Sequence, residues 1–314
     1  MSQKKKTTGA RQTLDLTRGF RPPYHGIYGL DPVEYPYADA EVVVLPVPYE
    51  QTTSYKANTR EGPRAIIDAS RYVESYDEEL DYEVYQVGIH TLPELDLDFT
   101  GPEKALKQMA VAAENILGDG KFLASLGGEH SVTPGLVAGV LKHYPKLTVL
   151  QLDAHADLRK EYEGTPNSHA CAMRRCRDLG AQTFGFGIRS YSAEEAAYVK
   201  KTGRAFYTAR ELKENLSVVE QVIDSINGPV YISIDVDAFD PAYVPATGTP
   251  EPGGLDWYEV RYILQTICRR THVVACDIVE LAPIGGLVAS DFLCAKLLYK
   301  LLGFVFYEGP NQKK

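Results

Sequence analysis

The sequence has little cysteine, no long apolar run and no excess of basic charge. Its five cysteines lack CxxC spacing, which argues against a disulfide framework or a zinc ribbon. We therefore expect a reduced, cytoplasmic protein whose thiols are small buried groups. No run of 18 apolar residues occurs, so a transmembrane helix is excluded. The cysteines are Cys171, Cys176, Cys268, Cys276 and Cys294.

The charge balance is acidic. Asp and Glu number 42 against 33 Lys and Arg, which gives a net charge of −9 over 314 residues. This balance offers no electrostatic case for nucleic acid or an anionic membrane, and it is compatible with a small cationic substrate. The first 21 residues are locally basic but lack the apolar core of a signal peptide. We predict a flexible tail over residues 1–22 and a single domain over 23–314.

Apolar runs alternate with amphipathic stretches after residue 22, which predicts an α/β fold with a parallel sheet. We expect strands at 41–46, 122–128, 147–152, 183–188, 230–236 and 272–281, and helices at 62–74, 101–117, 134–144, 256–270 and 288–302. Ser192 with Glu195, and Ser217 with Glu220, match capping boxes, so a helix should follow each serine.

Several of these strands end in polar clusters. GGEHS follows the strand at 122, DAHAD follows the strand at 147, DVDAFDP ends the strand at 230, and VEL closes the strand at 272. In open α/β sheets, sites form beyond the carboxyl ends of the strands. Four segments far apart in sequence should therefore converge on one crevice.

The second cluster carries Asp153, His155 and Asp157, separated by alanines, and Asp235 and Asp237 repeat the same two-residue spacing. Carboxylates packed at strand ends repel each other unless a cation is present. Carboxylate and imidazole ligands without thiolate suit Mn²⁺, Fe²⁺ or Zn²⁺, and the richness in carboxylate favours Mn²⁺.

His130, in the GGEHS cluster, brings the ligand set to six side chains. Six ligands fit two ions that share bridging carboxylates better than one ion. Asp240, directly before Pro241, instead suits a turn that its side chain caps.

The motifs GGEHS, DAHADLR and SIDVDAFDPAYVPATGTPEPGG resemble the three signatures of the ureohydrolase superfamily, which includes arginase, agmatinase and formimidoylglutamase. The similarity in order and spacing extends from the strand at 41 to near the C-terminus. It implies a three-layer α/β/α sandwich with a parallel eight-stranded sheet. It also implies two Mn²⁺ ions per chain, hydrolysis of a guanidino group to urea and an amine, and assembly into trimers or hexamers.

The resemblance also implies a role for each ligand. His130 and Asp157 would bind one ion, and His155 and Asp237 the other. Asp153 and Asp235 would bridge both ions, and a bridging hydroxide would attack the guanidinium carbon.

Two further residues take roles from the resemblance. His169 matches the family's proton-shuttling histidine, and Glu280 matches the acid that grips the guanidinium, a planar group that a carboxylate pairs well. We expect them to be catalytic together with Asp157. Without the resemblance, His169 would read as a surface-loop histidine and Glu280 as a strand-end glutamate.

The segment after the second motif departs from the arginase pattern. Arginases carry an asparagine for the substrate's α-carboxylate where this chain has Arg159, and the loop 160–169 also differs. Agmatine lacks that carboxylate, so we predict the agmatinase branch, with urea and putrescine as products. Glu161 or Glu163 could meet the terminal amine, or both could simply face solvent.

Arg159 keeps other readings open. It could pair with a neighbouring acid, or it could mark a carboxylate substrate such as 4-guanidinobutyrate; N1-aminopropylagmatine and arginine also remain alternatives. A non-catalytic regulatory protein is disfavoured because all six ligands are present. A mononuclear hydrolase using only His130 and the DAHAD cluster is a further rival.

Overall fold

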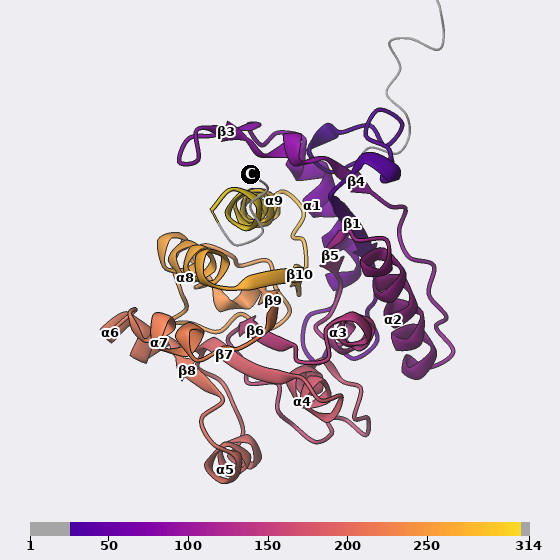
Figure 1. Ribbon diagram of the computed structural model, residues 1–314. Coiled ribbons are helices and arrows are strands. Elements are labelled where there is room, and N and C mark those ends of the chain that lie inside the picture. The colour runs from indigo at the N-terminus through magenta and orange to yellow at the C-terminus, as the bar shows by residue number, and fades with distance from the viewer. Residues whose placement is uncertain (1–25, 309–314) are drawn as a thin grey trace, which may run out of the picture.

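The computed structural model describes residues 26–308, so the predicted tail lies outside the described residues. Eight parallel strands form one central sheet, as predicted (Figure 1). Across the sheet the order is β4 (Ile89–Thr91), β1 (Val42–Val47), β5 (Phe122–Gly127), β10 (His272–Val279), β9 (Pro229–Asp235), β6 (Thr148–Leu152), β7 (Gln182–Ile188) and β8 (Phe206–Thr208).

Helices cover both faces of the sheet (Figure 1). One face carries α1 (Gly62–Ser70), α6 (Ala209–Glu214), α7 (Val218–Asp224), α8 (Trp257–Arg270) and α9 (Ala289–Gly303). The other carries α2 (Pro102–Gly118), α3 (Val132–His143), α4 (Ala172–Asp178) and α5 (Ala193–Thr202). The three-layer sandwich is therefore confirmed. No helix in residues 26–308 is long and apolar enough to cross a membrane.

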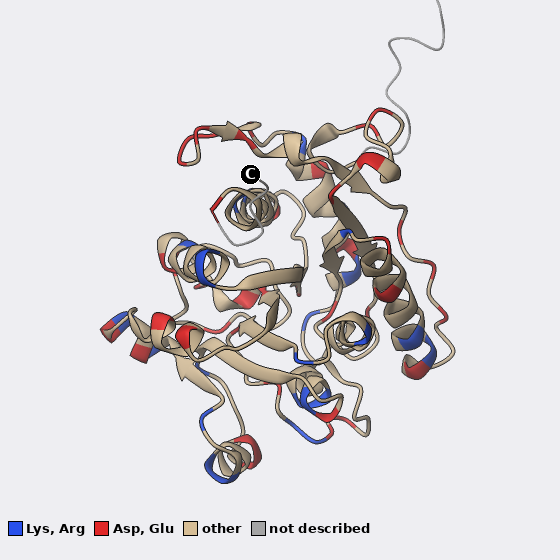
Figure 2. Ribbon diagram, in the orientation of Figure 1, with Lys and Arg blue, Asp and Glu red and all other residues tan. Residues whose placement is uncertain are grey.

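The apolar strands read as continuous runs because both faces of the sheet are buried. In β1, Val42 and Val44 face one core, whereas Val43 and Leu45 face the other. In Figure 2 the strands are mostly tan and the charges lie largely on the surrounding helices and loops. The five cysteines are free and buried, as expected.

Only one of the two predicted capping boxes forms. The Ser192 hydroxyl accepts the backbone N–H of Glu195, whose carboxylate accepts the N–H of Ser192. The prediction at Ser217 is wrong, although α7 does begin after it. Ser217 has helical backbone angles and donates its hydroxyl to Asn215 Oδ1 at 2.7 Å, so it caps nothing. Asn215 therefore competes successfully for this hydroxyl.

A buried lysine fastens the hairpin formed by β2 (Tyr76–Asp77) and β3 (Tyr82–Glu83) to α9. Lys300 is 1% exposed, and its Nζ lies 2.9 Å from Asp77 Oδ1 and 3.1 Å from Glu78 Oε1. Asp77 is fully buried, so removing the lysine would leave its carboxylate without a counter-charge. The residual N–H donors of Glu79 and Leu80 would compensate only in part.

We expect Lys300→Met to lower the free energy of unfolding by about 3 kcal/mol, the low end for a broken buried ion pair. Chemical denaturation followed by circular dichroism measures this. Lys296→Met is the matched control on the same helix: its Nζ lies 3.7 Å from the exposed Glu78 carboxylate, and such pairs contribute roughly 1 kcal/mol or less. Equal losses in the two variants would contradict the assignment.

Candidate metal centre

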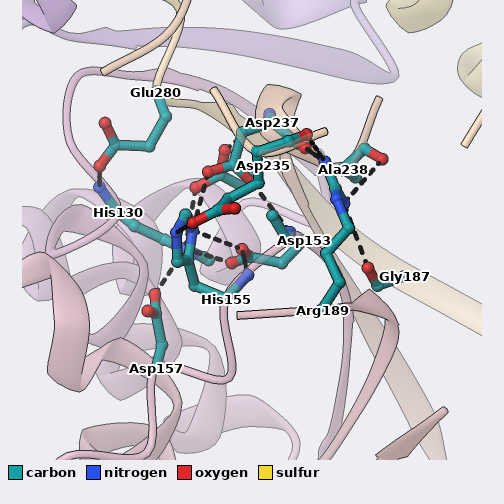
Figure 3. A network of polar contacts seen from close by, with 12 residues as sticks. His130, Asp153, His155, Asp157, Gly187, Arg189, Asp235, Asp237, Ala238 and Glu280 are labelled. Atoms are coloured by element: carbon teal, nitrogen blue, oxygen red, sulfur yellow. Dashed lines mark hydrogen bonds and ion pairs between the residues drawn. The ribbon is translucent and has the colours of Figure 1, made fainter. Parts of the chain in front are cut away.

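The ends of four neighbouring central strands, β5, β10, β9 and β6, carry the residues singled out by the sequence. The predicted convergence therefore occurs, and Figure 3 shows these side chains grouped around one point. After β5 comes His130, β6 leads into 153–157, β9 ends at Asp235 with Asp237 just beyond, and Glu280 follows β10.

Two sets of side chains have ligand atoms close enough to share a cation. One set is His130, Asp153 and Asp235, and the other is Asp153, His155 and Asp237; within each set the ligand atoms lie within 4.8 Å of one another. Asp153 belongs to both sets. The arrangement therefore offers two adjacent cation positions with a carboxylate between them.

The ring of His130 shows that these groups fit a metal ion. Its buried Nδ1 makes no hydrogen bond, yet carboxylate oxygens of Asp153, Asp157 and Asp235 lie 3.0, 2.9 and 3.4 Å away. Ligands about 2.1 Å from one ion and at right angles to each other would be roughly 3 Å apart. The spacing is therefore that of atoms converging on a shared cation.

Backbone N–H groups hold one oxygen of each central carboxylate. The N–H of His155 binds Asp153 Oδ1, the N–H of Ala154 binds Asp237 Oδ1, and the N–H of Asp237 binds Asp235 Oδ1. For Asp235 and Asp237, it is the second oxygen that faces a histidine Nδ1. Such supporting hydrogen bonds orient ligands before a metal arrives.

A buried polar network sets the tautomer of His130. Ser233 Oγ donates to Asp277 Oδ1 at 2.7 Å, while Asp277 Oδ2 accepts the hydroxyls of Tyr231 and Thr133. Because its only proton goes to Asp277, Ser233 Oγ must accept from His130 Nε2, 3.0 Å away. The Nδ1 lone pair then points toward the carboxylates, as a metal ligand requires.

The electrostatics of the cluster favour the binding of positive charge. Burial, then the charges of Asp237 and Asp153, raise the pKa of Asp235 well above its ordinary value. Burial and Asp153 raise the pKa of Asp157 to about 6. Burial would lower the pKa of His155, but Asp237 and Asp153 outweigh it and hold that pKa well above its usual range. Carboxylates in this setting become stable anions only with cations beside them.

Two residues at the site have left-handed backbone conformations, which are rare for residues other than glycine. Asp157 has φ 51° and Glu280 has φ 65°. Such strain is sustained when surrounding contacts enforce it, and it gathers at functional sites. Glu280 is held by its N–H to Gly128 O and by the N–H of His130, 2.6 Å from Glu280 Oε1. Burial and the charge of Glu129 raise the pKa of Glu280.

Arg189 supports the site and was missed in the sequence. Its guanidinium lies beside Asp237 (Figure 3) and donates to six backbone carbonyls. These belong to Gly187, Asp237, Ala238, Phe239, Glu251 and Pro252. The available signal was an arginine directly after an apolar strand, within GIRS. Arg189 ties the loop that carries Asp237 to the segment around Glu251.

A cavity of about 280 Å³ adjoins the cluster, and His155, Asp157, Arg159 and His169 line part of it. His169 therefore reaches the same space as two members of the ligand cluster. Glu280 is not part of this lining; it sits deeper, 7% exposed.

The rest of the cavity wall would contact the part of a bound molecule that lies farthest from the ligand cluster. Glu161 and Glu163 are exposed and do not line the cavity, whereas the rings of Tyr162 and Tyr191 do. Arg159 is not a free cation: its guanidinium lies 4.8 Å from the centre of the Tyr162 ring, and its Nε is 3.9 Å from Glu195 Oε2. This is the pairing with a neighbouring acid considered above.

Asp240 has the turn role expected of it. Its carboxylate accepts the N–H groups of Ala242, Gly253 and Gly254, which fixes the loop after β9 and leaves Asp240 outside both ligand sets.

Comparison with known proteins is consistent with this geometry. The model of the family described as "Arginase family" matches residues 40–303. An N(1)-aminopropylagmatine ureohydrolase from Synechocystis sp. is 40% identical over 88% of this chain and 92% of its own length. An agmatinase from Bacillus anthracis is 35% identical over 79% of this chain and 86% of its own. The crystal structure of agmatine ureohydrolase from Thermoplasma volcanium has a TM-score of 0.78 and 32% identity, covering 86% of this chain and 91% of that one.

Proposed function

This chain belongs to the arginase family, and from that premise we propose that it uses two Mn²⁺ ions to hydrolyse the guanidino group of a small cationic amine. It is a ureohydrolase of the type that acts on agmatine or aminopropylagmatine. The observation that carries the proposal is the pair of ligand sets sharing Asp153 beside the cavity that His169 lines.

The residues divide the chemistry as follows. His130 and Asp157 would hold one cation, His155 and Asp237 would hold the other, and Asp153 and Asp235 would be available to both. Cations bound there would act as Lewis acids and lower the pKa of a water molecule, so that hydroxide is available near neutral pH. This matters because a guanidinium is resonance-stabilised and a poor electrophile.

Glu280 and His169 act on the substrate in our proposal. Glu280 pairs with the guanidinium N–H groups from the buried end of the site, and His169 gives a proton to the leaving amine. Agmatine is the substrate that the departures from the arginase pattern favour. N1-aminopropylagmatine is the second candidate, favoured by the 40% identical relative and by the aromatic rings of Tyr162 and Tyr191 along the cavity wall, which suit a longer cationic chain.

A urea-release screen tests the substrate. Purified protein loaded with Mn²⁺ is assayed with agmatine, N1-aminopropylagmatine, 4-guanidinobutyrate, arginine and guanidine. We expect agmatine and N1-aminopropylagmatine to exceed arginine and 4-guanidinobutyrate in kcat/KM. The carboxylates of arginine and 4-guanidinobutyrate would find Arg159 already paired with Glu195. A preference for 4-guanidinobutyrate that Arg159→Ala reverses would overturn the choice of substrate and leave the ureohydrolase chemistry standing.

His169→Ala should keep two ions per chain and lower kcat by roughly 10²–10⁴-fold, the usual contribution of a positioned acid or base. Urea release and metal analysis of the same sample measure both quantities. His143→Ala is the control, because His143 lies exposed on α3, where its Nε2 is 2.9 Å from Glu114 O. Loss of metal in His169→Ala would show that His169 is a ligand instead.

We further propose that residues 23–314 act as one catalytic domain in the cytoplasm, in keeping with the free cysteines, and that the chain assembles into trimers or hexamers. Light scattering on the purified protein measures the assembly.

A further inference from the structure

Glu129 is a buried carboxylate that the reaction described above does not use. It lies between Gly128 and His130, is fully buried, and belongs to neither ligand set. Its Oε2 accepts the N–H groups of Gln51 and Thr52, at 2.8 and 2.6 Å. Its Oε1 accepts the hydroxyls of Thr52, at 2.7 Å, and of Ser131. All four donors therefore converge on this one side chain, and three of them come from residues 51–52.

The turn after β5, which carries Glu129, also holds the segment that contains Thr52. The N–H of Glu129 donates to Tyr49 O at 2.9 Å. Gly128 lies so close to Tyr49 that an added Cβ would be 1.9 Å from Tyr49 O. Only glycine permits this approach. The turn after β5 thus holds residues 49–52 in place, although they are about 80 residues away in sequence.

Thr52 in turn contacts His169 and restricts the orientation of its ring. Its Oγ1 accepts the backbone N–H of His169 at 3.0 Å and lies 3.3 Å from His169 Nδ1. A hydroxyl has one proton and two lone pairs. Because the proton of Thr52 points to Glu129 Oε1, the hydroxyl can only accept from His169. Nδ1 must therefore carry the hydrogen in this contact.

We infer that Glu129 and Thr52 are positioning residues that hold His169 in its Nδ1–H tautomer and leave Nε2 as the atom that exchanges the proton. This rests on the proton-transfer role proposed for His169. The protons balance in this step: the imidazolium releases its Nε2 proton to the leaving amine nitrogen, and the ring remains neutral with Nδ1–H. Neither positioning residue touches the substrate in this scheme, because both act through the imidazole ring.

Thr52→Val tests the inference because it keeps the shape of the side chain and removes the hydroxyl. We expect kcat to fall about tenfold, the value of one lost hydrogen bond of about 1.4 kcal/mol, with KM and the two-ion content unchanged. Thr52→Ser should restore kcat. Thr53→Val is the control, since the Thr53 hydroxyl makes no hydrogen bond within residues 26–308.

A double-mutant cycle separates positioning from a general structural role. In a His169→Ala background, Thr52→Val should cause no further loss of kcat, because there is no ring left to orient. An equal tenfold loss in both backgrounds, or loss of metal in Thr52→Val, would overturn the inference. Glu129→Gln should act in the same direction, since it replaces an accepting oxygen with a donating amide.

The tautomer of His169 can also be measured directly, without an activity assay. In ¹⁵N-histidine-labelled protein loaded with diamagnetic Zn²⁺, the His169 signals are assigned by their absence in His169→Ala. We expect Nδ1–H in the wild type and a shift of population toward Nε2–H in Thr52→Val. Unchanged tautomers would overturn the inference even if His169 proved essential. If His169→Ala retained full turnover while Thr52→Val still shifted the His169 tautomer, the proton-transfer role would be wrong. The positioning of the ring by Thr52 would stand.

Discussion

Replacing Asp153 by alanine is expected to remove both metal ions and nearly all urea release. Asp153 is the side chain common to the two ligand sets, so its loss weakens both positions, whereas His130→Ala should mainly weaken one. Metal ions supply several kcal/mol of charge stabilisation in transition states. At 1.36 kcal/mol per factor of ten, turnover should fall about 10⁴-fold or more.

Metal analysis after Mn²⁺ loading, followed by the urea assay, measures this effect. Asp240→Ala is the matched control, because Asp240 is an acid close in sequence to the ligands Asp235 and Asp237 but fixes a turn. It should retain two ions. Circular dichroism checks that each variant is folded. An Asp153→Ala protein that is folded and still binds two ions would contradict the shared role of this carboxylate.

Glu280→Gln is expected to reduce kcat/KM for every guanidino substrate through a rise in KM, without changing their order of preference. Glu280 is almost completely buried and held by the N–H of His130. A buried cation that loses its partner costs about 3–5 kcal/mol, which corresponds to a loss of roughly 10²-fold to 4 × 10³-fold. The effect is uniform because the guanidinium head group is common to all the substrates.

Steady-state kinetics with agmatine, N1-aminopropylagmatine and arginine measure the change. Arg159→Ala is the comparison variant, since Arg159 lines the outer cavity and its loss should change kcat/KM by a different factor for each substrate. A Glu280→Gln enzyme that changed the order, or kept a normal KM, would show that Glu280 does not bind the shared head group.

The sequence predicted the sheet and the ligand cluster because both follow from local patterns. Buried parallel strands are continuous apolar runs, and the polar residues just after them must lie at one edge of the sheet. Strands β4 and β8 were missed because three residues are too few to show a period. The cap at Ser217 was predicted from spacing alone, and spacing carried no information on competition by Asn215.

The residues that support the site were harder to predict than its ligands. Thr52 and Glu129 meet across 77 positions of sequence, and Arg189 reaches carbonyls about 50–60 residues away. Such contacts depend on how the loops fold over the sheet, and no periodicity encodes them. The same reason applies to Glu161 and Glu163, whose spacing from Asp157 did not reveal that both are exposed and lie outside the cavity lining.

The most direct test is a titration of metal-free protein with Mn²⁺ while urea release from agmatine and from N1-aminopropylagmatine is recorded. A two-metal ureohydrolase predicts no urea without metal and a rate that becomes maximal at two ions per chain. Full activity at one ion per chain, or no urea from either amine at any Mn²⁺ concentration, would contradict it.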